Sequence, residues 1–176
     1  MKRILVAALA IAAIASCNNA KVTSLSGTLP ADGPQTVTVQ IPELGVDTTI
    51  ALSDGKFTID LPVDDKVMGI VTAGDSRGSF IPDGGNLTFS VVPDEGVFVI
   101  GGGTKKGANA KCNALNEWMK DFMEQYTLAA MTDDAAAADS LFDVYIDKMK
   151  KTALDNPANY LGITALSSLR GQIDGS

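Results

Sequence analysis

Side chains that carry most enzymatic chemistry are scarce in this sequence. Its 176 residues include two cysteines, Cys17 and Cys112, and no histidine. A Ser–His–Asp triad needs a histidine, and so do the common zinc sites and the general bases that titrate near neutral pH. The sequence therefore argues against these enzyme classes. We predict a protein that is not an enzyme, with no catalytic residue, no cofactor and no metal site.

Cys112 admits two interpretations. A redox-active thiol commonly belongs to a CxxC pair, and Cys112 has no such partner. It lies three residues before Leu115, on the apolar face of an expected helix, where a free cysteine behaves as a small hydrophobic residue. We favour the buried hydrophobic residue and keep the redox thiol as the alternative.

A glycine-rich segment, 101–107, lies between an expected strand and an expected helix, which is where a phosphate-binding loop would lie. Gly102 and Gly107 even have the separation of the two glycines in that motif. However, Ala108 and Asn109 stand where it requires a lysine and a serine or threonine. We therefore interpret the segment as a flexible linker between the strands and the helices.

Acidic pairs could bind calcium or act as an acid and a base, and there are three of them: Asp64-Asp65, Asp94-Glu95 and Asp133-Asp134. Each pair falls at an expected turn or helix start, where aspartate forms local hydrogen bonds. None has the spacing of an EF-hand. We interpret them as solvated turn residues.

Trp118, Phe122 and Tyr126 lie on one face of an expected helix. Such a row could form an aromatic platform for a sugar or a peptide. The commoner role of an aromatic row at helical spacing is the core between a helix and a sheet, and we favour that interpretation.

The N-terminus has a basic start and an apolar run over residues 4–15, which is typical of a secretory signal and too short to span a bilayer as a stable helix. The run ends in Ile14-Ala15-Ser16-Cys17, which resembles the lipobox of bacterial lipoproteins. The resemblance implies that residues 1–16 are a lipoprotein signal peptide and that Cys17 is acylated. The alternative is an ordinary cleaved signal with an incidental cysteine.

Residues 17–21 are then a lipidated tether. The tether contains no acidic residue, and some Gram-negative lineages use acids after the cysteine to route lipoproteins to the cell surface. We therefore expect a lipid-anchored protein of the cell envelope, on the periplasm-facing side of the outer membrane.

The balance of charge limits the partners. The chain has a formal net charge of −7, and removal of Lys2 and Arg3 leaves 12 basic and 21 acidic residues, a net charge of −9. Such a balance argues against nucleic acid and against electrostatic attachment to anionic lipid. Membrane attachment would have to come from the acyl chains.

Residues 22–103 alternate in hydrophobicity between turn-forming segments, which predicts about eight short strands in an antiparallel β-sandwich. Thr36–Ile41 is typical, with Val37, Val39 and Ile41 on one face. Asp54-Gly55 between two extended runs is the strongest short hairpin signal, because both turn positions need a positive φ. A β-rich α+β fold follows.

Residues 104–176 change to helical periodicity. Two helices, the second running from 133–134 to about Leu154, form an antiparallel hairpin, and a third short helix follows. Asn156 is expected as the N-cap of the third helix, with Pro157 at its first helical position and Gly171 at its end. The buried face of the second helix is predicted to comprise Leu141, Phe142, Tyr145, Met149 and Ala153.

Short motifs across residues 22–170 resemble one known arrangement; they are Ser26-Gly27, Asp54-Gly55-Lys56-Phe57, Phe80-Ile81-Pro82-Asp83-Gly84-Gly85, Gly103-Thr104 before a helical hairpin, and Asn156-Pro157-Ala158-Asn159-Tyr160-Leu161-Gly162. In this order they are similar to a β-sandwich domain at the N-terminus of lipid-anchored thioredoxin-like proteins, the peroxiredoxin-related thiol–disulfide reductases of the bacterial envelope. In that family a thioredoxin domain with a CxxC motif follows the helices. This sequence reaches Ser176 without one. We expect a truncated or stand-alone member.

The expected function is therefore a non-catalytic accessory or interaction module of a thioredoxin-like thiol–disulfide oxidoreductase system. The partner would be a thioredoxin-like domain, supplied in cis by a fuller chain or in trans, and a homodimer stays open. The alternative is a β-sandwich lipoprotein that binds a glycan or another envelope ligand on its loops or on a sheet face with exposed aromatic residues.

Overall fold

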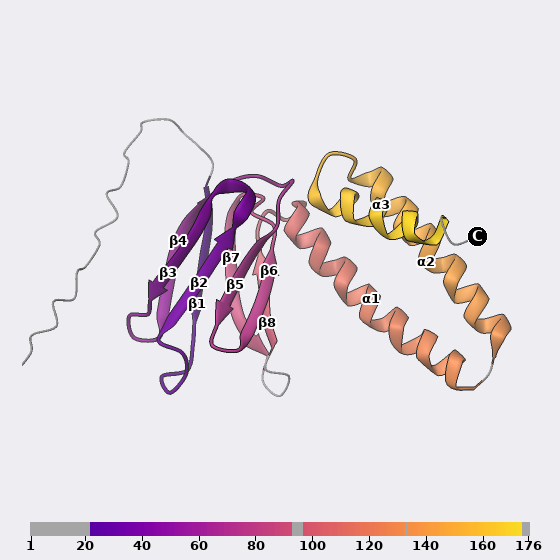
Figure 1. Cartoon of the computed structure of the whole chain (residues 1–176), viewed down its shortest axis with the longest axis horizontal. Coiled ribbons are helices and arrows are strands. Elements are labelled where there is room, and N and C mark those ends of the chain that lie inside the picture. The colour runs from indigo at the N-terminus through magenta and orange to yellow at the C-terminus, as the bar shows by residue number, and fades with distance from the viewer. Residues whose placement is uncertain (1–21, 93–96, 133, 174–176) are drawn as a thin grey trace, which may run out of the picture.

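The computed structural model describes residues 22–92, 97–132 and 134–173 (Figure 1). The predicted signal peptide and Cys17 lie outside these ranges. The strands are β1 (Val22–Thr28), β2 (Thr36–Ile41), β3 (Val46–Ala51), β4 (Lys56–Pro62), β5 (Gly69–Ala73), β6 (Ser76–Phe80), β7 (Gly85–Val92) and β8 (Val97–Gly102), with a short 3-10 helix, η1 (Pro42–Leu44). The helices are α1 (Ala108–Met131), α2 (Ala135–Asp155) and α3 (Tyr160–Ile173). The predicted β-rich α+β class with eight strands followed by three helices is confirmed.

The eight strands form two four-stranded sheets, with the orders β4-β1-β7-β8 and β3-β2-β5-β6. The prediction of purely antiparallel pairing is wrong at one place, because β1 and β7 pair in parallel, with Leu25 opposite Leu87. Between β1 and β7 the chain passes through the second sheet twice, as β2-β3 and as β5-β6, with β4 in the first sheet between the two passages, and β7 then runs in the direction of β1. The first sheet is therefore mixed.

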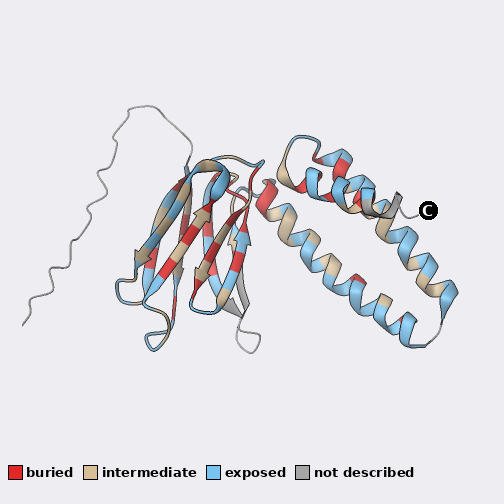
Figure 2. Ribbon diagram, viewed as in Figure 1, coloured by how far each residue is buried: buried red, intermediate tan, exposed pale blue. Residues whose placement is uncertain are grey.

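The two sheets contribute to one hydrophobic core. In β2, Val37, Val39 and Ile41 are buried and the residues between them are not, as period-2 patterning requires for a sheet with one covered face. Figure 2 shows buried positions along the strands, whereas β3 alternates between half-buried and exposed residues. The core residues are Leu25, Leu29, Val37, Val39, Ile41, Phe57, Leu61, Val67, Val71, Ala73, Phe80, Leu87, Phe89 and Ile100.

The Asp54-Gly55 turn forms as predicted, with φ angles of 51° and 73°. Backbone hydrogen bonds join Ser53 and Lys56 in both directions across it. The ladder stops after this single bridge, because β3 continues into one sheet and β4 into the other. The turn therefore connects the two sheets and does not close a long hairpin.

Gly27 accounts for the close packing at the centre of the mixed sheet. It lies opposite Phe57 on β4 and Phe89 on β7. The two rings meet edge to face, with centroids 5.7 Å apart. A Cβ at Gly27 would lie only 2.7 Å from Phe89 Cβ and 2.8 Å from the Phe57 ring, so a larger residue would displace the ring pair.

The helices extend to one side of the sheets, and α1 touches the strands only near its N-terminal end (Figure 1). They share a separate hydrophobic cluster centred on Met149, Ala153, Ala165 and Leu169. Asp134 caps α2 by accepting a hydrogen bond from the backbone N–H of Ala137 at 3.0 Å. Among the described residues, no helix is long and apolar enough to span a membrane.

The boundaries of the third helix differ from the prediction. Asn156 closes α2, and its side chain donates a hydrogen bond to Thr152 O at 2.9 Å. The N-cap of α3 is Asn159, whose Oδ1 accepts from the N–H of Gly162 at 3.2 Å. Pro157 lies in the turn between the helices, and α3 continues through Gly171 to Ile173. The predicted cap at Asn156 is therefore wrong, because its side chain is bonded to Thr152 and Lys111, and the helix begins three residues later than expected.

Candidate functional site

The strands and the helices are joined by a polar junction centred on Asp83 and Asn109. Asp83 Oδ2 accepts a hydrogen bond from the backbone N–H of Asn109, in the first turn of α1, at 2.9 Å. The residue at the local N-cap position, Gly107, has no side chain to do this. Asp83 therefore caps α1 from the turn that precedes β7, and its charge complements the positive end of the helix.

Asn109 completes the junction from the helix side. Its side chain is buried, with 1% exposed. Its Oδ1 accepts from the N–H of Ile81 at 3.1 Å, and its Nδ2 donates to Gly102 O at 3.3 Å. A buried amide with these partners holds the start of α1 against the ends of β6 and β8.

The same geometry argues against phosphate in the glycine-rich segment. The Asp83 carboxylate occupies the space beside Gly103 and Gly107, so closely that a Cβ at either glycine would collide with it. Its Oδ1 is buried and has no hydrogen-bond partner among the described residues. A fixed negative charge at this helix N-terminus would repel a phosphate. The φ angles of Gly102 and Gly103 are 86° and 87°, and a hydrogen bond from the N–H of Gly107 to Thr104 O at 2.9 Å closes the turn that leads into α1.

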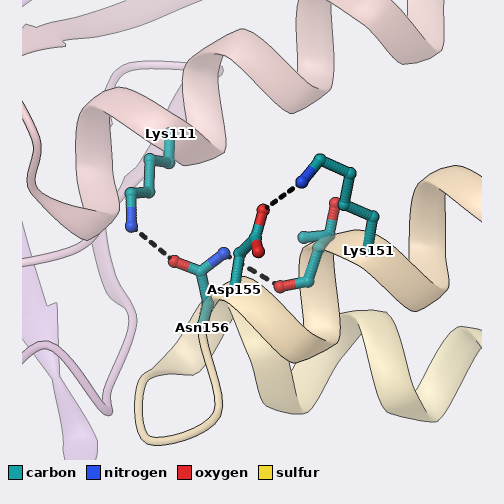
Figure 3. Close-up of polar contacts among 5 residues, drawn as sticks. Lys111, Lys151, Asp155 and Asn156 are labelled. Atoms are coloured by element: carbon teal, nitrogen blue, oxygen red, sulfur yellow. Dashed lines mark hydrogen bonds and ion pairs between the residues drawn. The ribbon is translucent and has the colours of Figure 1, made fainter.

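A second set of contacts holds the α2–α3 turn. The backbone N–H of Tyr160 donates to Asp65 O at 2.8 Å, which connects α3 to the turn after β4. Lys111 Nζ donates to Asn156 Oδ1 at 2.8 Å, which connects α1 to the end of α2 (Figure 3). A Cβ on Gly162 would overlap the carbonyl oxygen of Asn156, so glycine is needed where the two helices approach. Asp83, Asn156 and Gly162, which belong to the motifs behind the family resemblance, thus lie at turns and junctions, whereas Ser26-Gly27 lies within β1.

Cys112 lies half-buried on α1, beside a cavity of only about 20 Å³ that is also lined by Met68, Ile81 and Tyr160. Burial raises the pKa of its thiol, and a weak hydrogen bond from Asn116 acts in the opposite direction. A thiol with a raised pKa is protonated at neutral pH and is a poor nucleophile. The environment favours the apolar interpretation over the redox thiol.

The structure describes both residues of the Asp64-Asp65 pair and Asp134 of the Asp133-Asp134 pair, and the aspartates take local roles. Asp64 Oδ1 accepts from the backbone N–H of Lys66 at 2.9 Å, which is a turn contact. Asp134 is the N-cap of α2. Asp94-Glu95 and Asp133 lie outside the described residues. Within the described ranges, no three histidine, cysteine or acidic residues are placed to hold a metal ion.

The aromatic row of α1 packs against α2 and not against a sheet, so the expected helix–sheet core is wrong. Phe122 stacks on Trp118 and Tyr126, with ring centroids 5.4 and 5.8 Å apart, and its ring lies 5.5 Å from that of Tyr145. The N-terminal end of α1 is tied to the strands, and the rest of the helix leads away from them (Figure 1). The row therefore meets the neighbouring helix.

A groove of about 290 Å³ runs between α1 and α2 over these rings. We call it the hairpin groove; its residues are Met119, Phe122, Met123, Tyr126, Phe142 and Tyr145. Met123 and Phe142 are 49% and 38% exposed, so Phe142 does not belong to the buried face predicted for α2. Apolar exposure continues past the groove to the end of α1, where Leu128 and Met131 are 64% and 80% exposed.

Comparisons of the chain with protein-family models, with curated proteins and with solved structures find no match. The function must therefore be argued from the geometry. Sequence analysis overlooked the roles of Asp83 and Asn109 and the exposure of the hairpin groove. A helix that starts at a glycine has no local cap side chain and needs an acceptor from another element, but nothing in the sequence indicates that Asp83 supplies it.

The glycan-binding alternative gains no support from the phenylalanines of the strands. Phe57, Phe80 and Phe89 are at most 5% exposed and belong to the core. The side chain of Phe98 lies outside the described residues. The described aromatic residues that do reach the surface, such as Phe142, are on the helices.

Proposed function

We propose that this protein is a lipid-anchored, non-catalytic interaction module whose hairpin groove docks a thioredoxin-like domain, supplied in cis or in trans. The observation that carries the proposal is the exposed apolar and aromatic surface on two helices that extend away from the strands. Patches of this kind on a soluble surface mark sites of protein–protein contact.

The composition of the hairpin groove suits a protein partner. Phenylalanine, tyrosine and methionine are enriched at the centres of protein interfaces. Methionine side chains adapt to the shape of a partner, and aromatic rings supply large contact areas with little loss of side-chain entropy. The identity of the partner comes from the motif resemblance, which points to the thioredoxin-like envelope proteins.

The strands would serve as the spacer in this arrangement. We interpret the two sheets with their common core as a β-sandwich that holds the helices away from the membrane. β1 begins at Val22, so acylation at Cys17 would place the strands within a few residues of the bilayer. The polar junction at Asp83 would then fix where the helices lie relative to the strands, and so relative to the bilayer.

Site-specific photo-crosslinking in cells that make the protein tests the proposal. A photoreactive residue at Met123 should crosslink to a protein that carries a thioredoxin-like CxxC domain. The matched control places the same residue at Thr58, an exposed position on β4, and should not capture that protein. A crosslink from Met123 to a protein without such a domain, or to a second copy of this chain alone, would overturn the choice of partner.

Activity assays test the proposal that the chain is not catalytic. The purified chain should not reduce insulin disulfides or peroxide, and substitution of Cys112 by alanine should change neither result. Turnover that depends on Cys112 would show that the chain is itself a redox enzyme.

A further inference from the structure

A second concave surface lies on the helices, distinct from the hairpin groove. It is a cleft of about 480 Å³ where α1, the C-terminal half of α2 and the start of α3 meet. Lys111, Lys148 and Lys151 line it, together with the apolar side chains of Leu115 and Leu161. We propose that this lysine cleft binds a small oxyanion, a carboxylate or phosphate group that is attached to a short apolar portion.

Within the part of the chain that the structure describes, two of the three ammonium groups have no carboxylate partner. Lys151 forms an ion pair with Asp155 at 3.0 Å, which balances its charge (Figure 3). Lys111 donates to the neutral amide of Asn156, and among the described residues neither it nor Lys148 forms an ion pair. Two positive charges of the cleft are therefore not paired with a carboxylate of residues 22–92, 97–132 or 134–173.

The ammonium group of Lys148 is held in place by its surroundings. Its side chain is half-buried, and its Nζ lies 5.3 Å from the centroid of the Trp118 ring. A cation over an indole face is attracted by the ring and loses part of its hydration. An ammonium group in that state gains more from an anion than a fully hydrated one does.

The surroundings of the cleft also favour an anionic ligand. The chain as a whole is acidic, with a net charge of −7, so a local positive surplus is not the average character of its surface. Leu161 is the second residue of α3, whose N-terminal end carries partial positive charge. A volume of about 480 Å³ lies within the usual range for small-molecule sites. The apolar floor accepts the hydrocarbon part of a ligand.

NMR titration of the ¹⁵N-labelled full chain in an uncharged detergent tests the proposal, with inorganic phosphate and hexanoate as separate probes. At least one probe should give saturable shifts confined to the amides of the cleft, with a Kd of about 1 mM or lower. Saturation by phosphate alone assigns a phosphate group, and saturation by hexanoate assigns a carboxylate. Shifts that rise linearly with both probes, or that spread to lysines outside the cleft such as Lys150, would overturn the proposal.

Matched variants locate the effect. Lys111→Met with Lys148→Met should weaken binding at least tenfold, whereas Lys150→Met, an exposed lysine of α2 outside the cleft, should leave it unchanged. The double variant Lys111→Arg with Lys148→Arg keeps both charges and should bind within about threefold of the parent. Unchanged binding in the methionine pair, or equal loss in the Lys150 control, would contradict the site.

Discussion

The carboxylate of Asp83 and the backbone N–H of Asn109 are 26 residues apart in the sequence and 2.9 Å apart in the structure. Through this contact a turn between two strands caps the first helix. The helices leave the sheets at this point, and Asn109 adds buried hydrogen bonds to Ile81 and Gly102. The direction in which the hairpin extends therefore depends on a few polar atoms.

Removal of the Asp83 cap should destabilise the chain. Asp83→Ala leaves the N–H of Asn109 without its acceptor, and loss of an N-cap side chain costs about 1–2 kcal/mol. Urea unfolding followed by circular dichroism measures the change. The control Asp60→Ala removes an exposed carboxylate from β4 and should shift the free energy of unfolding by no more than about 0.5 kcal/mol. Equal effects of the two substitutions would contradict the capping role.

Gly27 should not tolerate even one added methyl group. In Gly27→Ala the new Cβ meets the side chains of Phe57 and Phe89 at 2.7–3.0 Å, and overpacking of this kind costs about 1–3 kcal/mol. Gly101→Ala is the matched control, because a Cβ there has no atom within 4 Å, and thermal unfolding should separate the two variants. Stabilities that agree within error would show that the ring pair can move aside freely.

Asn159, and not Asn156, should behave as the N-cap of α3. Asn159→Ala removes the acceptor for the N–H of Gly162 and should cost about 1 kcal/mol. Asn159→Asp keeps an acceptor and adds a charge that favours the helix N-terminus, so its stability should equal or exceed that of the parent. Denaturant midpoints measure both, and a neutral Asn159→Ala would restore Asn156 as the candidate cap.

Cys112 should react slowly. Its raised pKa and partial burial reduce the thiolate fraction and the access of a reagent, so iodoacetamide at pH 8 should modify it at least about tenfold more slowly in the folded chain than in urea. Mass spectrometry of the tryptic peptide 112–120 follows this cysteine separately from Cys17. Equal rates in the two states would show an exposed, reactive thiol.

The pH dependence of stability follows from the same shift. The folded chain holds the proton of Cys112 more tightly than the unfolded chain, because desolvation disfavours the thiolate. The associated stability is fully present below the pKa of the unfolded thiol and is lost as the pH rises through the folded pKa. Cys112→Ala should therefore flatten the alkaline decline in the free energy of unfolding, measured from neutral pH upward. An unaltered slope would show that this thiol contributes nothing to it.

Several features were predictable from the sequence because their causes are local. The alternation in Thr36–Ile41, the positive φ angles at Asp54-Gly55 and the cap at Asp134 each depend on residues only a few positions apart. The same holds for the number of strands and helices. Periodicity and turn chemistry act over one turn or one strand, so they can be evaluated before the fold is known.

Other features depended on contacts between distant segments. Examples are the parallel pairing of β1 with β7 and the Asp83 cap, which join residues far apart in the sequence. Another is the placement of β3 and β4 in different sheets, although a regular hairpin turn connects them. No short-range sequence pattern indicates any of the three. The aromatic row of α1 illustrates the limit for the candidate site. Its spacing showed that Trp118, Phe122 and Tyr126 share a face, but only the tertiary structure decided that this face meets α2 and stays partly open. A periodic pattern identifies the helix face that will be buried. Which element packs against that face depends on the free energy of the whole folded chain.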